Sequence, residues 1–405
     1  MSLLPHLKGL PENRPFYSTT VINSSGGRGD LPVIRRVLVS RHNHTYHSIM
    51  SETVLVTGAS GFIGSSLALA LSARGFHVRA FYRKGDDARR LIGARGPCTR
   101  IQRIEGDICD ESALVQAARG CSAVFHLAGN VSFRKADFNE QHKVNVEGTR
   151  AVVNACLQTD ARRLVHTSTV NAIGLPKPDR AIGDENTPWS KDMERFGYAV
   201  TKRQGERLAL QACGPKLEVV VVNPGTVFGA GDINANAGSY ILAMARFPML
   251  FYPGGGVSCT HIAAAVDGHI AALYRGRPGQ RYILGGENLT YREIFAIIAD
   301  VLRRPDPGGP YPQRAVPRMV GLRMAVPRMA VPRLPLPRAA AVALAFVAEA
   351  FGLSSKLSPD AARAGDLTFF FSSAKAQREL GYRILPFRSA VEQAVRWYRK
   401  EGFLR

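Results

Sequence analysis

The 405-residue sequence lacks the features that mark membrane, metal-binding and disulfide-bonded proteins. No apolar run reaches the roughly 18 residues that a bilayer-spanning helix needs. The nearest approach, residues 339–353, is shorter and contains Glu349, and we expect it to form a packed helix. The six cysteines are scattered, without a CxxC pair or a histidine at metal-ligand spacing. We therefore expect free thiols, no metal site and a cytoplasmic location.

Acidic residues are scarce relative to basic ones, and the formal net charge is +21. About half of the excess lies in two irregular segments, because residues 1–50 carry +4 and residues 301–340 carry +7. No nucleic-acid-binding module accompanies this charge. We therefore expect a basic surface that suits an anionic cofactor or substrate, and no nucleic-acid partner.

Residues 1–49 show no sustained hydrophobic periodicity, and a strand–turn–helix pattern begins directly after them. We interpret this irregular extension as a disordered leader or the product of a mis-assigned start codon. A targeting peptide is the alternative, because acidic residues are few there. Met50 is where a compact enzyme with this pattern would begin.

The next part of the chain alternates β-rich runs with helical patterns, as a parallel α/β sheet requires. The expected strands are 53–57, 77–82, 101–106, 122–128, 163–168 and 217–222, and the expected helices are 62–74, 137–158 and 192–212. Continuous apolar runs suit strands that are covered on both faces. The sequence therefore predicts an α/β protein with a Rossmann-type doubly wound parallel sheet in residues 50–235.

Beyond residue 235 the pattern loosens, and we expect residues 236–405 to form a small C-terminal α/β substrate lobe. A helix over 262–274, a strand over 281–286 and a helix over 389–400 are predicted. Thr290 and Glu293 have capping-box spacing and would begin a helix that ends near Arg303. A Pro/Arg repeat at 312–338 excludes a regular helix there, and we interpret it as a surface insertion, with a docking segment as the alternative.

A glycine-rich turn, TGASGFIG at 57–64, joins the first predicted strand to the first predicted helix. Gly58 allows a tight turn, Gly61 lets the backbone approach a pyrophosphate, and Gly64 allows close helix–strand packing. The helix N-terminus adds amide donors and a positive dipole end. The spacing is GxxGxxG instead of the more common GxGxxG, but its position between strand and helix predicts dinucleotide binding.

Three later strand ends complete the predicted cofactor site. Arg83 follows the second strand, where an arginine accommodates the 2′-phosphate of NADP and an acid would select NAD, so we predict NADP with NAD as the alternative. Asp107 would accept from the adenine amino group. Leu127, Ala128 and Gly129 would run along the cofactor, whereas the neighbouring His126 is interpreted as a core residue.

Tyr198 and Lys202 are the candidate residues for proton transfer. They lie four residues apart on one face of a predicted helix. A phenol has a pKa of about 10, and a nearby ammonium or nicotinamide cation would lower it. Tyr198 could then pass a proton to or from a substrate oxygen, and Lys202 could also hold the nicotinamide ribose. A hydroxyl from Ser168 or Thr169 would hold that oxygen, and alternation along the strand allows only one of them to face the cleft.

Taken in order, TGASGFIG, EGDI, HLAG, VNVEGT, HTSTVNAIG, YAVTK and NPGTVFGAGD resemble the extended short-chain dehydrogenases, also called the NAD-dependent epimerase/dehydratase family. The match covers about residues 52–300. RYILGGENLT and FFFSSAKAQRELGY are similar to the dihydroflavonol-reductase-like branch and to hopanoid-associated sugar epimerases.

This resemblance implies the catalytic set Thr169, Tyr198 and Lys202, and so selects Thr169 over Ser168. It implies cofactor contacts from Gly58, Gly61, Phe62, Ile63, Gly64, Arg83, Asp107, Ile108, Leu127, Ala128, Gly129, Asn145, Tyr198, Lys202 and Pro224. It also implies a homodimer through helices 137–158 and 192–212. Two departures are Ala263 and Ala264, which replace the acids that usually follow His261. A third is the absence from GGGVSCTH of an arginine that grips a diphosphate, which argues against a UDP-sugar substrate.

We therefore expect an enzyme that transfers hydride between NADP(H) and a carbonyl or secondary alcohol of a small organic molecule. The first alternative is an NAD-dependent sugar or nucleotide-sugar epimerase or dehydratase that uses the same residues. The second is a dinucleotide-binding protein without catalytic activity.

Overall fold

The computed structural model describes residues 52–92, 100–176, 182–247, 249–304, 331–332, 334–350 and 358–404. Internal contacts divide the chain into residues 1–49 and residues 50–405. The predicted irregular extension and most of the Pro/Arg repeat lie outside the described residues. The fold and the site below therefore concern the second unit.

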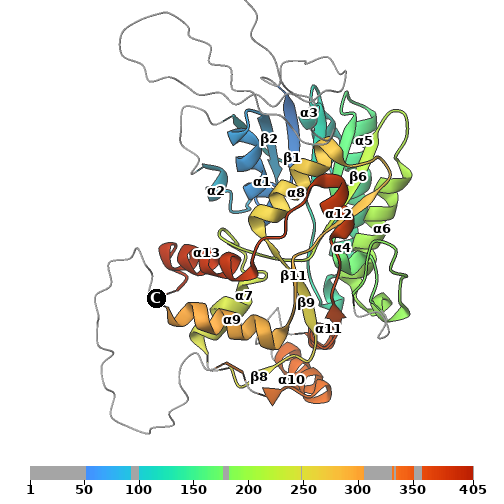
Figure 1. Cartoon of the computed structure of the whole chain (residues 1–405). Coiled ribbons are helices and arrows are strands. Elements are labelled where there is room, and N and C mark those ends of the chain that lie inside the picture. The colour runs from blue at the N-terminus through green and yellow to red at the C-terminus, as the bar shows by residue number, and fades with distance from the viewer. Residues whose placement is uncertain are drawn as a thin grey trace, which may run out of the picture. The chain divides into compact units, whose positions relative to one another are not determined.

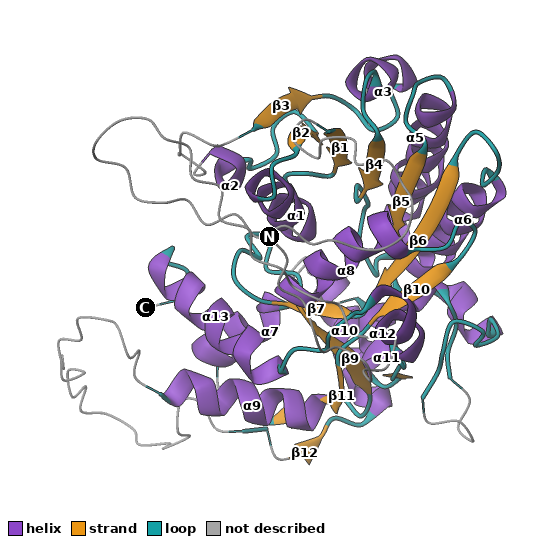
Figure 2. Cartoon of the chain, turned by 45° about the horizontal axis from the view of Figure 1, so that its top comes forward, coloured by secondary structure: helices purple, strands orange, loops and turns teal. Residues whose placement is uncertain are grey.

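A parallel sheet forms the centre of this unit, and its described strands follow the order β3-β2-β1-β4-β5-β6-β10 (Figure 2). The strands are β1 (Thr53–Thr57), β2 (His77–Tyr82), β3 (Ile101–Glu105), β4 (Ala123–His126), β5 (Arg163–Thr167), β6 (Glu218–Pro224) and β10 (Arg281–Leu284). All of these pairings are parallel. The strand order reverses between β1 and β4, and open α/β sheets bind ligands at such a point. The predicted Rossmann-type fold is confirmed.

Helices cover both faces of this sheet because successive side chains point to opposite faces. Val54 and Val56 pack in the core beneath α1 (Phe62–Ala73) and α8 (Ile262–Arg275), whereas Leu55 packs in the opposite core. That second core is covered by α3 (Glu111–Ala118), α5 (Gly148–Leu157) and α6 (Gly197–Gln211) (Figure 1). Strands buried on both faces explain the continuous apolar runs in the sequence.

Most predicted elements form within a few residues of their expected bounds, and two predicted helices are irregular. The 192–212 pattern begins with a 3₁₀ turn at Lys191–Arg195, and its α-helix, α6, starts only at Gly197 because Phe196 is extended. The 137–158 pattern becomes a short α4 (Phe138–His142), a π-helical turn at Lys143–Glu147, and then α5. Thr290 and Glu293 form the expected capping box at the start of α9 (Tyr291–Arg303). Single π turns are frequent at functional sites, and this one carries Asn145.

A second, smaller sheet belongs to the C-terminal half of the chain. It contains β11 (Glu287–Thr290), β9 (Gly256–His261), β13 (Thr368–Phe369) and β7 (Thr226–Phe228). Its core also includes α7 (Gly238–Arg246), α9 and α13 (Phe387–Lys400), where the Phe228 and Phe387 rings lie 4.9 Å apart between centroids. α8 and β10 follow residue 235 yet extend the main sheet and its helical cover. The proposed boundary at 235 stays a prediction.

Shorter elements connect these layers. They are α2 (Arg89–Ile92), β8 (Phe251–Tyr252), β12 (Leu334–Pro335), α10 (Arg338–Ala350), α11 (Pro359–Gly365) and α12 (Ala374–Leu380). Within the described ranges, no helix is long and apolar enough to cross a membrane, and no group of side chains is arranged to hold a metal ion.

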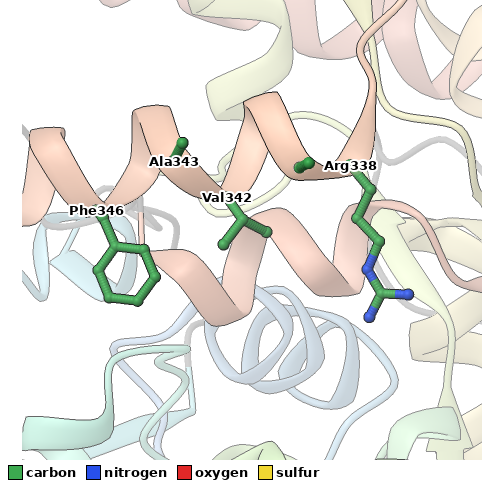
Figure 3. Close-up of a pocket in the computed structure, with 5 residues that line it drawn as sticks. Arg338, Val342, Ala343 and Phe346 are labelled. Carbon is green, nitrogen blue, oxygen red and sulfur yellow. The ribbon is translucent and has the colours of Figure 1, made fainter.

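The structure corrects one expectation, because α10 is not packed on all sides. Its large side chains Leu344, Phe346 and Val347 are half or more exposed, while the small Ala345 and Ala348 are buried. Figure 3 shows Arg338, Val342 and Phe346 projecting from one side of the helix, where they border a hollow of about 610 Å³. Alanine lets the helix lie close to its neighbours, so the larger residues remain outside.

Phe125, in the centre of β4 and without solvent exposure, tests the contribution of the α1–α8 core. We expect Phe125→Ala to lower the free energy of unfolding by about 3–5 kcal/mol, because the cavity cannot fully collapse. Urea unfolding measures the change. The control Leu157→Ala removes a side chain that is 42% exposed and should stay within about 0.5 kcal/mol of the parent protein. Equal effects of the two substitutions would contradict this packing.

Candidate active site

The glycine-rich turn forms a tight junction between β1, β4 and α1. Gly58 adopts a left-handed φ of 66°, and a Cβ atom there would lie 2.5 Å from the Ala128 backbone nitrogen. A Cβ on Gly64 would collide with the Gly58 carbonyl oxygen, and Gly61 is the N-cap residue of α1. Only glycine allows this approach, which leaves a backbone cradle at a helix N-terminus that fits a dinucleotide pyrophosphate.

The first two residues of α1, Phe62 and Ile63, differ in how deeply they are buried. Phe62 is buried in the α1 core and Ile63 packs partly against it. Both therefore support the cradle through α1.

The segment after β2 returns to this cradle through its side chains. Ser60 Oγ donates to Asp86 Oδ2 at 2.8 Å, and the Arg83 guanidinium contacts Asp86 Oδ1 at 3.1 Å. The Arg83 side chain is 72% exposed, so its remaining donors face solvent. Asp86 lies in the loop that follows β2, and no sequence spacing indicated its bond to Ser60. The two residues place one acid and one base beside the glycine turn.

Arg90 in α2 fixes the same segment to α1. Its guanidinium donates to the Phe62 carbonyl at 3.2 Å, to Ser65 Oγ at 2.6 Å and to the Gly231 carbonyl at 3.1 Å. Burial lowers the pKa of this guanidinium. Arg90 therefore joins the cofactor cradle to the loop that leads into α7, a role that the sequence did not reveal.

The end of β4 forms the other side of the cradle. Leu127 and Ala128 are partly buried and Gly129 is exposed. Asn145, on the π turn, accepts from the Asn130 backbone nitrogen at 2.8 Å and donates to the Asn130 carbonyl at 3.0 Å. The Asn145 side chain is thus occupied by the backbone that follows Gly129. Its place in the structure is that of a residue that holds this loop.

The remaining predicted cofactor residues lie at the ends of neighbouring strands. Asp107 is exposed after β3, and its carboxylate accepts from the Cys109 backbone nitrogen at 2.9 Å. Ile108 packs where a Cβ on Gly148 would come within 3.0 Å of it. Pro224 ends β6 and is buried. These positions line the carboxyl edge of the sheet, as the fold requires.

Thr169, and not Ser168, reaches Tyr198. A polar interaction with the Thr169 side chain lowers the pKa of the Tyr198 phenol, and Thr169 Oγ1 accepts from the Asn171 backbone nitrogen at 3.3 Å. Ser168 Oγ is buried without a hydrogen-bond partner among the described residues. Strand alternation turns the two hydroxyls to opposite sides, which resolves the choice that the residue pattern had left open.

Tyr198 retains its proton more firmly in this structure than the sequence argument supposed. Burial raises the pKa of its phenol to about 12, and the hydrogen bond from Thr169 opposes only part of that rise. The Phe133 ring lies 6.3 Å from the Tyr198 ring, which adds an apolar neighbour. We expected a neighbouring cation to lower this pKa, but the shift comes from burial and from Thr169, and burial dominates. At neutral pH the phenol is therefore protonated.

Lys202 is buried, and its ammonium donates to the Thr167 carbonyl at 2.7 Å. Burial lowers the pKa of Lys202 to about 8, while the charge of Glu206 raises it. The side chain is thus cationic at neutral pH and loses its charge as the pH rises through about 8. A Cβ on Gly129 would lie 3.8 Å from Lys202 Nζ. The cation therefore lies next to the loop that follows β4.

Sequence reasoning missed a carboxylate network behind this lysine. Glu206 accepts from Asn223 Nδ2 at 2.8 Å and from the Arg281 guanidinium at 3.0 Å, and Asn223 also donates to the Thr169 carbonyl at 3.0 Å. The sequence did contain an indication of this network. Glu206 follows Lys202 by four residues, just as Lys202 follows Tyr198, so the three side chains lie on one face of the helix.

Two histidines near the site, His126 and His261, form hydrogen bonds that stabilise the fold. His126 is buried, and its two ring nitrogens bond to the Thr57 and Thr149 hydroxyls at 2.8 and 3.0 Å, as expected of a core residue. Burial lowers its pKa to about 3, so it stays neutral. His261 Nδ1 accepts from the Ala263 backbone nitrogen at 3.0 Å and caps α8. The ring is thus the N-cap of α8, whose first turn contains Ala263 and Ala264 in place of acids.

Comparison with known proteins identifies the family of this chain. Residues 54–285 match the model of the NAD dependent epimerase/dehydratase family. The chain therefore belongs to that family and is an NAD(P)-dependent enzyme of the extended short-chain dehydrogenase type that acts on small molecules.

Among its relatives, sterol demethylase protein B of Methylococcus capsulatus is 30% identical over 357 residues, which cover 87% of this chain and all of that protein. Dihydroflavonol 4-reductase of Zea mays is 30% identical over 267 residues, or 61% of this chain and 74% of the relative. The crystal structure of gox2253 superposes with a TM-score of 0.71 at 29% identity and covers 87% of this chain and all of the other.

The close approach of Gly58 to Ala128 predicts that cofactor binding requires glycine at position 58. Gly58→Ala must push β1 and β4 apart or distort the turn, so we expect the affinity for NADPH to fall by more than about tenfold. Fluorescence titration measures the dissociation constant. Gly75→Ala is the matched control, because Gly75 also has a positive φ of 96° but has no atom within 4 Å of its Cβ position. Similar losses in both variants would show that φ alone, and not the close approach, matters.

Proposed function

We propose that the protein is an NADP(H)-dependent reductase that converts a carbonyl of a small organic substrate into a secondary alcohol. The pairing of the Thr169 hydroxyl with the Tyr198 phenol, whose pKa it lowers, carries this proposal together with the buried cation of Lys202 one turn further along α6. This set offers a hydroxyl to orient a substrate oxygen, a phenol to protonate it, and a positive charge beside it.

The residues of this chain perform the proton part of the reaction. The bound nicotinamide would supply the hydride, and Gly58, Gly61 and Gly64 would hold its pyrophosphate. Thr169 orients the substrate carbonyl oxygen toward the Tyr198 hydroxyl, which donates its proton as negative charge develops on that oxygen. Because burial keeps the phenol protonated at neutral pH, the resting site is ready for reduction. Lys202 holds positive charge next to the developing phenolate.

The surroundings of Tyr198 favour an apolar substrate. Phe133 makes edge contacts with both Tyr198 and Phe196, at 6.3 Å between ring centroids in each case. Val131, two residues earlier, is more than half exposed. The names of the relatives, a dihydroflavonol 4-reductase and a sterol demethylase protein, suggest polycyclic probes. We infer that a ring ketone suits this site better than a nucleotide sugar.

Tyr198→Phe tests the mechanism. We expect it to reduce the turnover of a dihydroflavonol or ketosteroid probe by about a thousandfold, because general acid catalysis contributes roughly 10²–10⁴-fold. NADPH oxidation at 340 nm measures turnover. NADPH affinity should stay within about threefold of the parent value, which shows that the cofactor site is intact. Normal turnover in this variant would exclude Tyr198 as the proton donor.

Cofactor choice is tested at Arg83. Its exposed guanidinium can turn to a 2′-phosphate, so Arg83→Ala should weaken NADPH binding about tenfold, the loss of about 1.5 kcal/mol for a charge-assisted hydrogen bond. NADH binding should not change. Arg89→Ala is the matched control, because Arg89 is 71% exposed and pairs with Asp87 as Arg83 pairs with Asp86.

The acid of this pair supports the other cofactor, because Asp86 beside Ser60 could accept from a ribose hydroxyl of NAD. Tighter binding of NADH than of NADPH by the unmodified protein would therefore overturn the NADP assignment. Tightly retained NAD in the purified protein would favour the epimerase alternative, since internal redox recycling needs a cofactor that stays bound. The homodimer and the cytoplasmic location stay predictions from the sequence.

A further inference from the structure

A buried carboxylate lies behind the proposed catalytic lysine, on the side away from the glycine turn. The Glu206 side chain is only 3% exposed. One of its oxygens accepts from Arg281 of β10 at 3.0 Å, and the other accepts from Asn223 of β6 at 2.8 Å. Burial of a carboxylate is costly unless it is paired and hydrogen-bonded. Glu206 meets both conditions with residues from two different strands.

The same carboxylate lies one helical turn from Lys202 and faces few competing charges. The groups around Lys202 are Tyr198 and Glu206 on α6, His126 on β4 and His166 on β5. Two cations lie near Glu206: Arg281, which is paired with it, and Arg203 of α6, which interacts with it through charge. Both histidines are fully buried, and desolvation lowers the pKa of each far enough to keep it neutral. Glu206 is therefore the negative charge in this set at neutral pH.

A second connection leads from Glu206 to the substrate-orienting hydroxyl. Asn223 Nδ2 donates both to Glu206 and to the backbone carbonyl of Thr169, at 3.0 Å. Thr169 adopts an extended conformation that begins a short 3₁₀ turn. One carboxylate thus acts on Lys202 through its charge and on Thr169 through one amide.

We propose that Glu206 is a positioning residue of the active site, which keeps Lys202 cationic inside the protein and, through Asn223, holds the backbone of Thr169. This inference rests on the proposed function, in which the Lys202 cation assists Tyr198 and holds the nicotinamide ribose. Glu206 itself touches neither substrate nor cofactor. Removing its charge should therefore change how cofactor affinity and activity depend on pH. A residue that only supports the fold would not have this effect.

The test is Glu206→Gln, which keeps the size of the side chain and an acceptor for Asn223 but removes the charge. Burial sets the pKa of Lys202 at about 8, and Glu206 acts to raise it. Loss of the Glu206 charge lowers the pKa of Lys202, so that, as the pH rises, Lys202 loses its proton at a lower pH than in the parent protein. We expect the alkaline limb of NADPH affinity, and of kcat/KM for the dihydroflavonol probe, to move down by about one pH unit. At pH 6 the variant and the parent protein should agree within about threefold.

Two further variants separate charge from structure. Glu206→Asp keeps the charge and should keep the parent position of the alkaline limb. Glu206→Gln combined with Arg281→Gln removes both members of the ion pair, so Arg281 is not left buried without its partner. This double variant should show the shifted limb even if the single variant folds poorly. Glu218→Gln is the control, because it breaks another Arg–Glu pair, with Arg163 at the opposite end of β5, and should shift nothing.

NADPH affinity against pH, measured by fluorescence, makes the result independent of turnover. If no carbonyl probe is reduced, the proposed reductase activity fails, while a shifted affinity profile still supports the role of Glu206. Superimposed profiles of the parent protein and the charge-removing variants would overturn the inference. So would an equal loss of affinity or activity at every pH, because that pattern indicates a purely structural role.

Discussion

The close backbone approach of β1 and β4 is the constraint on which the site depends. These strands meet at the reversal of strand order, where Gly58 lies against Ala128 with no room for a side chain. The same approach sets the start of α1 and the direction of the chain after Gly129. It therefore places the pyrophosphate cradle next to the loop that Asn145 holds, at the same edge of the sheet as the proposed catalytic residues after β5 and on α6.

Burial then determines the chemistry of the catalytic residues. Desolvation raises the pKa of Tyr198 to about 12 and lowers that of Lys202 to about 8, so each shift disfavours the charged form. A phenol that keeps its proton suits donation to an alkoxide, but a lysine that loses its proton easily needs support. The network of Glu206, Asn223 and Arg281 is placed to give that support. It connects α6, β6 and β10, so the outermost strand of the main sheet contributes to the site.

Local sequence patterns predicted the central sheet because their physical causes are local. Alternating β-rich and helical runs, the glycine turn and the capping box at Thr290 each depend on neighbours within a few residues. The helix at 339–350 shows the limit of such patterns. Its composition indicated burial, but the face that packs is made of alanine, and the larger apolar residues lie outside. Hydrophobicity alone does not determine which side of a helix finds a neighbour.

The sequence by itself determined the fold class, the glycine turn and the spacing of Tyr198 and Lys202, because periodicity and helix geometry are properties of the local chain. Only the tertiary structure decided that Asp86 returns to Ser60 and that His261 caps α8. The choice of Thr169 over Ser168, which the residue pattern had left open and the family resemblance had made, is consistent with the interaction between Thr169 and Tyr198. The tertiary structure alone brought Glu206 together with Arg281, 75 residues away. These contacts join residues on different strands and loops, and their distances follow from the packing of the whole sheet.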